Sequence, residues 1–175
     1  MERAYDLLNR NNAPAALKAG QQLEARRYSG GFEIQARALM AMGRRKQAIA
    51  VLERGVEEIP GNWSLWEGLG NNRSENGDYE GACAAYERAL ACDCDRASVT
   101  YNYVEALTRA ERWDEAEALI APLFATGAVR DAGPTLGLYL VNAYEDILRH
   151  GGRDEEAALM IEGHADVLAR AALDE

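Results

Sequence analysis

The sequence repeats itself with a period of 34 residues, and this period constrains the fold more than any other feature. The positions in register are Gly43, Gly77 and Glu111, then Ala48, Ala82 and Ala116, then Leu52, Tyr86 and Ile120. A period of this length, with small and aromatic residues at fixed offsets, is typical of stacked helix–turn–helix units. One such unit cannot bury its apolar face alone, so neighbouring units are expected to stack and share a core.

The turn signals divide the chain into an all-α solenoid of about five antiparallel helix pairs. The predicted pairs are 2–10 with 14–27, 32–42 with 45–58, 63–75 with 79–92, 97–110 with 113–124, and 135–150 with 154–172. Gly77 and Asp78 are expected to supply the left-handed turn and the helix cap within the third pair. Gly127, Gly133 and Pro134 interrupt the period, so segment 125–134 is predicted to be an inserted loop.

The period also predicts how a single domain, 1–175, is subdivided. The predicted segments are a short N-terminal pair at 1–28, repeats at 29–62, 63–96 and 97–130, an insertion at 131–137 and a divergent repeat at 138–175. Small residues such as Gly70 and Ala82 let helices approach, and large ones fill the seams, at about 1.5–3 kcal/mol for each side chain buried. We therefore interpret four aromatic residues as core rather than ligand contacts: Trp66, Tyr79, Tyr86 and Trp113.

The charge balance bounds the kinds of partner. The net charge is −10 and 48% of the residues are hydrophobic, which excludes a disordered chain. Nucleic acids and anionic membranes need clustered Lys and Arg, so neither is expected as a partner. A neutral or basic protein or peptide is easier to accommodate. The alternative is that the acidity only maintains solubility.

The residues that could carry chemistry are few. Three cysteines, Cys83, Cys92 and Cys94, fit a reducing compartment better than a disulfide scaffold, and they lack a fourth ligand of suitable kind for a metal. His150 falls at a predicted helix end, where a cation is favoured by the helix dipole. No nucleophile is paired with a base, so we expect no catalysis, no metal and no cofactor. The start of the chain has early charges and no apolar run, so a cytoplasmic location is expected.

The middle copy of the period resembles the tetratricopeptide repeat (TPR) family. The matching residues are Trp66, Leu69, Gly70, Gly77, Tyr79, Ala82, Tyr86, Ala89 and Leu90. Cys94 replaces the final proline of the family pattern, and Val104 takes the place of its small residue in the fourth repeat, which should push those two helices slightly apart. The resemblance implies a right-handed superhelix whose concave groove is lined by the first helix of each pair.

The resemblance also implies which residues line that groove. They are Arg37 and Met40 on the second pair, Glu67, Asn71 and Glu75 on the third, Tyr101, Asn102, Glu105 and Arg109 on the fourth, and Tyr139, Asn142, Asp146 and Arg149 on the fifth. Some family members grip an acidic peptide C-terminus with asparagines at the places of Asn71 and Asn102 and with nearby cations. Here Glu67, Tyr139 and Ala143 occupy the cationic places. Our hypothesis is that the groove holds a neutral-to-basic segment; the alternative is that these are solvated residues of helix faces.

The function implied by the resemblance is protein–protein interaction without catalysis. We expect an adaptor or scaffold that holds a partner segment in its groove. One alternative is a dedicated chaperone, because acidic TPR chaperones of bacterial secretion systems are similar in size, charge and repeat content. A further alternative is self-association, because terminal repeats can stack on each other.

Overall fold

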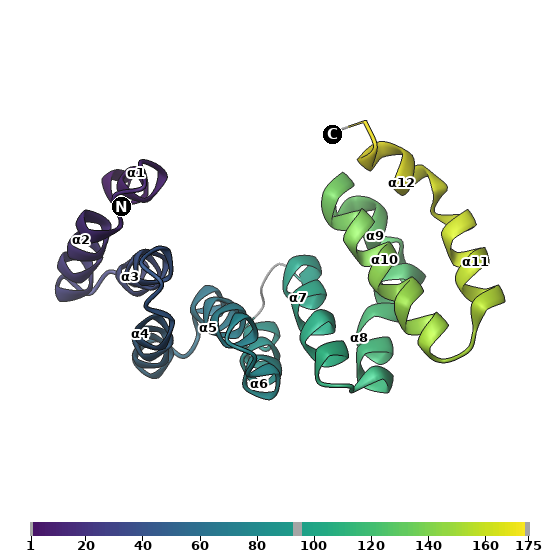
Figure 1. Cartoon of the computed structure of the whole chain (residues 1–175), viewed down its shortest axis with the longest axis horizontal. Coiled ribbons are helices and arrows are strands. Elements are labelled where there is room, and N and C mark those ends of the chain that lie inside the picture. Colours follow the sequence, from purple (N-terminus) through teal and green to yellow (C-terminus); the bar gives the residue numbers. More distant parts are fainter. Residues whose placement is uncertain (1, 93–95, 174–175) are drawn as a thin grey trace. The chain divides into compact units, whose positions relative to one another are not determined.

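Regular secondary structure is entirely helical in the part of the chain that the computed structural model describes, residues 2–92 and 96–173 (Figure 1). Contacts between Cα atoms divide the chain into two compact units, Met1–Cys94 and Asp95–Glu175. We refer to them as the N-terminal and C-terminal units. Each contains helix pairs joined by short turns, and each is described by itself below.

The N-terminal unit consists of three helix pairs. Its helices are α1 (Glu2–Asn9), α2 (Ala13–Ala25), α3 (Gly30–Ala41), α4 (Arg45–Glu58), α5 (Trp63–Glu75) and α6 (Tyr79–Leu90). Helices that follow one another along the chain pack side by side from α1 to α6. These helices follow the predicted ones closely, because the turn residues mark their ends locally.

The turn between α5 and α6 shows the local signals at work. Gly77 has a φ of +81°, a left-handed conformation that glycine adopts without the steric cost of a side chain. The next residue, Asp78, caps α6, because its Oδ1 accepts a hydrogen bond from the backbone N–H of Gly81 at 3.0 Å. Both roles predicted from the sequence are therefore confirmed.

The contact between α5 and α6 depends on a glycine facing a tyrosine. A Cβ atom added at Gly70 would lie 2.5 Å from Cε1 of Tyr86, so only glycine fits against this ring. The Tyr86 side chain is 2% exposed, and its hydroxyl donates a hydrogen bond to Oδ1 of Asn71 at 2.7 Å. The predicted core role of Tyr86 is confirmed. Trp66 is partly buried and packs against the hydrophobic core, and Tyr79 is partly buried.

The same two places are filled differently in the neighbouring repeats. One period before Gly70 and Tyr86 stand Ala36 and Leu52, and one period after stand Val104 and Ile120. All of these residues are buried. The smallest residue on the first helix is thus matched with the largest on the second, and Val104 is matched with the smaller Ile120. The total side-chain volume is not constant, because Val104 and Ile120 together have two more carbon atoms than Ala36 and Leu52. The largest side chain on the second helix accompanies the glycine, whose missing Cβ makes room for it.

The C-terminal unit is arranged around one long helix. Its elements are α7 (Arg96–Arg109), α8 (Trp113–Thr126), α9 (Ala128–Asp131), α10 (Pro134–His150), α11 (Asp154–Gly163) and α12 (Ala165–Ala171). Helix α10 contacts α7, α8, α9, α11 and α12. It buries Leu140, Val141, Ile147 and Leu148, which form one apolar face at helical spacing.

The predicted loop at 125–134 is wrong. Helix α8 continues to Thr126, α9 forms a short helix, and α10 already begins at Pro134. Val129 on α9 is fully buried, and the Arg130 guanidinium donates to the Gly163 carbonyl at 2.6 Å. The insertion is therefore packed against the rest of the unit, because it contributes an apolar side chain to the core and a cation that meets an exposed helix end.

The predicted continuous helix at 154–172 is also wrong, because it is interrupted at His164, between α11 and α12. At the interruption Nδ1 of His164 lies 2.8 Å from the Met160 carbonyl, to which it donates a hydrogen bond. The imidazole also meets the ring of Phe124 edge-on, with 5.0 Å between centroids. The imidazole of His164 therefore contacts the last turns of α8 at the point where the helix is interrupted.

Candidate functional site

Each unit contains an open groove between the first helices of two successive pairs. In the N-terminal unit this groove lies between α3 and α5 and has a volume of about 290 Å³. Its walls include five residues predicted as groove residues: Arg37, Met40, Glu67, Asn71 and Glu75. The first helix of each pair therefore lines this hollow, as the repeat register predicts.

Most of the charged groups in the α3–α5 groove have partners within the unit. The Arg37 guanidinium lies 3.3 Å from the carboxylate of Glu33, and the Glu75 carboxylate lies 3.7 Å from the Arg45 guanidinium. The Asn71 amide oxygen accepts the hydrogen bond from Tyr86. This bond fixes the amide orientation of Asn71 from within the core.

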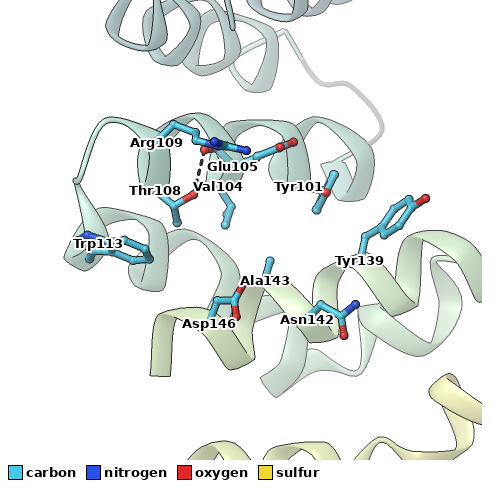
Figure 2. Close-up of a pocket in the computed structure, with 10 residues that line it drawn as sticks. All are labelled: Tyr101, Val104, Glu105, Thr108, Arg109, Trp113, Tyr139, Asn142, Ala143 and Asp146. Carbon is cyan, nitrogen blue, oxygen red and sulfur yellow. Dashed lines mark hydrogen bonds between the residues drawn. The ribbon is translucent and has the colours of Figure 1, made fainter. Parts of the chain in front are cut away.

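The C-terminal unit holds the larger of the two grooves, with a volume of about 410 Å³ between α7 and α10 (Figure 2). We call it the α7–α10 groove. Ten residues line it: Tyr101, Val104, Glu105, Thr108, Arg109, Trp113, Tyr139, Asn142, Ala143 and Asp146. Figure 2 shows α7 along one wall and α10 along the other, with Val104 and Ala143 as small apolar side chains between them. Six predicted site residues converge here, three from each wall.

Two tyrosines from opposite walls stack at one end of the α7–α10 groove. The rings of Tyr101 and Tyr139 are 5.5 Å apart between centroids and inclined by 22°. Burial raises the pKa of the Tyr101 hydroxyl above 10.0, with smaller contributions from Glu105 and Tyr139. The Tyr139 side chain nevertheless remains 47% exposed. The pair therefore forms an aromatic surface that is accessible from the solvent.

Three charged residues of this groove form no ion pair with the described residues. Glu105 and Asp146 are exposed on opposite walls, and within residues 2–92 and 96–173 no ion pair to either carboxylate is formed. Arg109, on the same wall as Glu105, likewise forms none with the described residues. By contrast, Glu145 and Glu117 nearby are each held by an arginine. The groove therefore keeps two carboxylates and one guanidinium available.

Two of the predicted site residues, Asn102 and Arg149, line neither the α3–α5 groove nor the α7–α10 groove. The Arg149 guanidinium lies 2.8 Å from the Glu145 carboxylate and 3.2 Å from that of Asp154, so it is committed to contacts along α10 and toward α11. Neither Arg149 nor Asn102 is among the residues that line the α7–α10 groove. Register places a residue on a helix face, but it does not say which neighbour its side chain contacts.

Trp113 is the groove residue that sequence reasoning assigned to the core. It begins α8, lines one end of the groove and stacks on His150 with 3.8 Å between centroids and an angle of 13°. His150 lies in the last turn of α10, as predicted, and its ring also stacks on this indole. The signal available in the sequence was the position of Trp113 directly after the α7–α8 turn, which faces the groove end.

Metal-ligand clusters and membrane-spanning helices were considered within the described residues. Among them, no group of three His, Cys, Asp or Glu side chains could hold a metal ion. Cys94, which was considered with Cys83 and Cys92 as a metal ligand, lies outside the described residues. In the same ranges no helix is both long and apolar enough to cross a membrane.

Comparison with protein families identifies the repeat. Two family models described as tetratricopeptide repeat match residues 35–95 and 74–132. Together they span 35–132, which is more than half of the 175 residues. No curated protein sequence matches the chain significantly.

Solved structures with the same architecture align with most or nearly all of the chain. A protein named MamA is 16% identical, with a TM-score of 0.79 over 98% of each chain. TPR-like repeats of a kinesin light chain from Podosopora anserina are 18% identical, with a TM-score of 0.75 over 98% of this chain and 93% of that one. A thermophilic TPR protein of Thermus thermophilus is 25% identical, with a TM-score of 0.66 over 81% of this chain and 77% of that one. These likenesses confirm the predicted all-α solenoid fold class.

Proposed function

Because the chain belongs to the tetratricopeptide repeat family, a family of protein–protein interaction modules, we propose that it is a noncatalytic adaptor or scaffold that binds a segment of a partner protein in its concave grooves. One observation carries the proposal. Three residues from α7 and three from α10 meet around the α7–α10 groove, which is open and about 410 Å³ in volume. They are Tyr101, Glu105, Arg109, Tyr139, Asn142 and Asp146.

The groove walls suit an extended or helical segment. Ala143 offers a small apolar contact between the walls, above the buried Val104, whereas Asn142 and Thr108 offer hydrogen-bonding groups. Grooves of this kind combine apolar contact area with a few polar groups that fix the orientation of the ligand. The α7–α10 groove is therefore suited to binding a peptide segment.

A neutral-to-basic partner is favoured over an acidic one. The α7–α10 groove carries Glu105 and Asp146 against one cation, and the α3–α5 groove carries Glu67 and Glu75. With a net charge of −10 over the whole chain, an acidic segment would be repelled during approach. Complementary charge would instead raise the association rate and fix the register of the bound segment.

The experiment that tests this proposal blocks the groove sterically. Tagged wild-type protein is used to capture partners from the native lysate beside an Ala143→Trp variant, whose indole would fill the space between α7 and α10. Ala158→Trp, at an exposed place on α11, adds the same side chain away from the groove. Circular dichroism and thermal melts establish that both variants fold.

Loss of a captured partner with Ala143→Trp, and its retention with Ala158→Trp, is the expected result. A partner retained equally by both variants would move binding away from the α7–α10 groove and contradict the proposal. A captured partner that aggregates whenever this chain is absent would replace the adaptor role with a chaperone role. One that is stable by itself agrees with an adaptor.

A further inference from the structure

The aromatic end of the α7–α10 groove offers an unusual contact surface. Tyr139 is among the few large hydrophobic side chains in the described residues that remain strongly exposed, although it stacks on Tyr101. Stacking covers part of each ring and leaves the rest available. The open π-face of a tyrosine attracts a cation, and a planar cation can also stack on it.

The two carboxylates supply the charge that such a cation needs. Glu105 projects from α7 and Asp146 from α10, so the negative groups flank the groove from both walls (Figure 2). Glu105 also contributes to the raised pKa of Tyr101, which places its charge near the aromatic pair. Elsewhere in this unit Glu115, Glu117, Glu145 and Glu156 are each within 3 Å of an arginine nitrogen. Glu105 and Asp146 have no such arginine in the described structure, and they lie in the groove itself.

The Arg109 guanidinium offsets only part of this negative charge. It stands one helical turn after Glu105 on the same wall, yet no ion pair joins it to Glu105 or to Asp146 in the described structure. The three exposed charges leave a net charge of −1 in the hollow. Arg109 can instead donate to backbone carbonyls of a bound segment, since a guanidinium carries donors and no acceptor.

We infer that the α7–α10 groove binds an arginine side chain of the partner segment, with its guanidinium against the Tyr101–Tyr139 pair beside Glu105 and with Asp146 adding negative charge further along the groove. This inference rests on the proposed function and specifies its ligand. Arginine is favoured over lysine because its planar, weakly hydrated guanidinium stacks on aromatic rings and donates bidentate hydrogen bonds to carboxylates. An acidic side chain would meet two carboxylates and one guanidinium, so it is disfavoured.

The test uses small probes, so it needs no knowledge of the partner. Resonances of the 19.2 kDa protein are followed during titration with N-acetyl-arginine amide, N-acetyl-lysine amide and N-acetyl-citrulline amide. Citrulline keeps the shape of arginine and removes its charge. The test variant is Glu105→Gln/Asp146→Asn. The control variant is Glu155→Gln/Glu162→Gln, which removes the same charge from exposed places on α11.

Saturable shifts of Tyr101, Tyr139 and Asp146 resonances with the arginine probe are expected. Its Kd should be about threefold or more below that of the lysine probe and about tenfold below that of citrulline. The test variant should raise the arginine Kd about tenfold, whereas the control should leave it within about twofold.

Several outcomes would overturn the inference. They are equal binding of arginine and lysine, equal binding of arginine and citrulline, shifts scattered outside the groove, or an equal loss of affinity in the control. The partner-capture experiment with Ala143→Trp distinguishes a failure of the arginine inference from a failure of the proposed groove-binding function. A partner that is lost with Ala143→Trp but retained by Glu105→Gln/Asp146→Asn keeps the groove as the binding site and removes arginine as its ligand.

Discussion

Substitution of Gly70 by alanine tests the packing argument most directly. The new Cβ atom would lie 2.5, 2.7 and 2.8 Å from three atoms of the Tyr86 ring. The ring has little room to move, because it is 2% exposed and its hydroxyl bonds to Asn71. Overpacking of this kind costs about 1–3 kcal/mol, and the higher helix propensity of alanine returns about 0.5–1 kcal/mol. We expect Gly70→Ala to lower the free energy of unfolding by about 1–2 kcal/mol.

Gly68 provides a matched control in the same helix. A Cβ atom added there would lie 3.4 Å from Cδ2 of Leu52, which is ordinary van der Waals contact. Gly68→Ala should therefore show only the propensity gain and raise the free energy of unfolding by about 0.5–1 kcal/mol. The two substitutions are chemically identical and two residues apart, so opposite signs would isolate the contact with Tyr86.

The assay is urea denaturation followed by circular dichroism, repeated in a Tyr86→Leu background. Leucine recreates the Ala36–Leu52 combination of the preceding repeat, so Gly70→Ala should cost almost nothing there. The double-mutant cycle should give a coupling free energy of about 1–3 kcal/mol. The reasoning is refuted if Gly70→Ala is neutral or stabilising in the wild-type background, or if Tyr86→Leu leaves its cost unchanged.

Three further predictions concern caps and charges. Asp78→Ala should lower the free energy of unfolding by about 1 kcal/mol through loss of the α6 cap, and Asp78→Ser should restore most of it in the same denaturation assay. The hydrogen bond from Arg153 lowers the pKa of Glu156 below 4.5; stability from this pair is therefore present above 4.5 and is lost as the pH falls through the lower, folded-state pKa. The Tm difference between wild type and Arg153→Gln should accordingly shrink on acidification from neutral pH, and a constant difference would contradict the pair. Glu105→Gln should lower the pKa of Tyr101 but leave it above 10.0, because burial is the larger cause; ultraviolet titration of the tyrosines, with Tyr101→Phe as the reference, measures this shift.

The fold was predictable wherever the signal is local. Gly77 and Asp78 set the turn within the third pair by their own backbone and side-chain preferences, so the helix bounds there could be placed from the sequence. Segment 125–134 contains similar signals in Gly127, Gly133 and Pro134, and these also mark the ends of helices. The short helix between them depends on the burial of Val129, which is a tertiary effect that no local pattern reports.

The candidate site was predictable to the extent that register determines it. The 34-residue period placed Tyr101 and Tyr139 on first helices, and the structure brings them into one groove. The repeat register does not predict which of several neighbouring groups a side chain contacts. Arg149 is drawn to Glu145 and Asp154, whereas Trp113 is shared between the groove and His150.

The residues that face each other within a helix pair also determine which segments of the gene can be recombined without loss of packing. Gly70 leaves room for the ring of Tyr86, whereas the equivalent places of the next repeat hold the buried Val104 and Ile120. A recombination event that joins the first helix of one repeat to the second helix of another would combine Val104 with Tyr86, or Gly70 with Ile120. The first product is overfilled and the second is hollow. Crossovers between helix pairs preserve each matched set, so the whole hairpin is the smallest segment that duplication, deletion or shuffling can move without a second, compensating substitution.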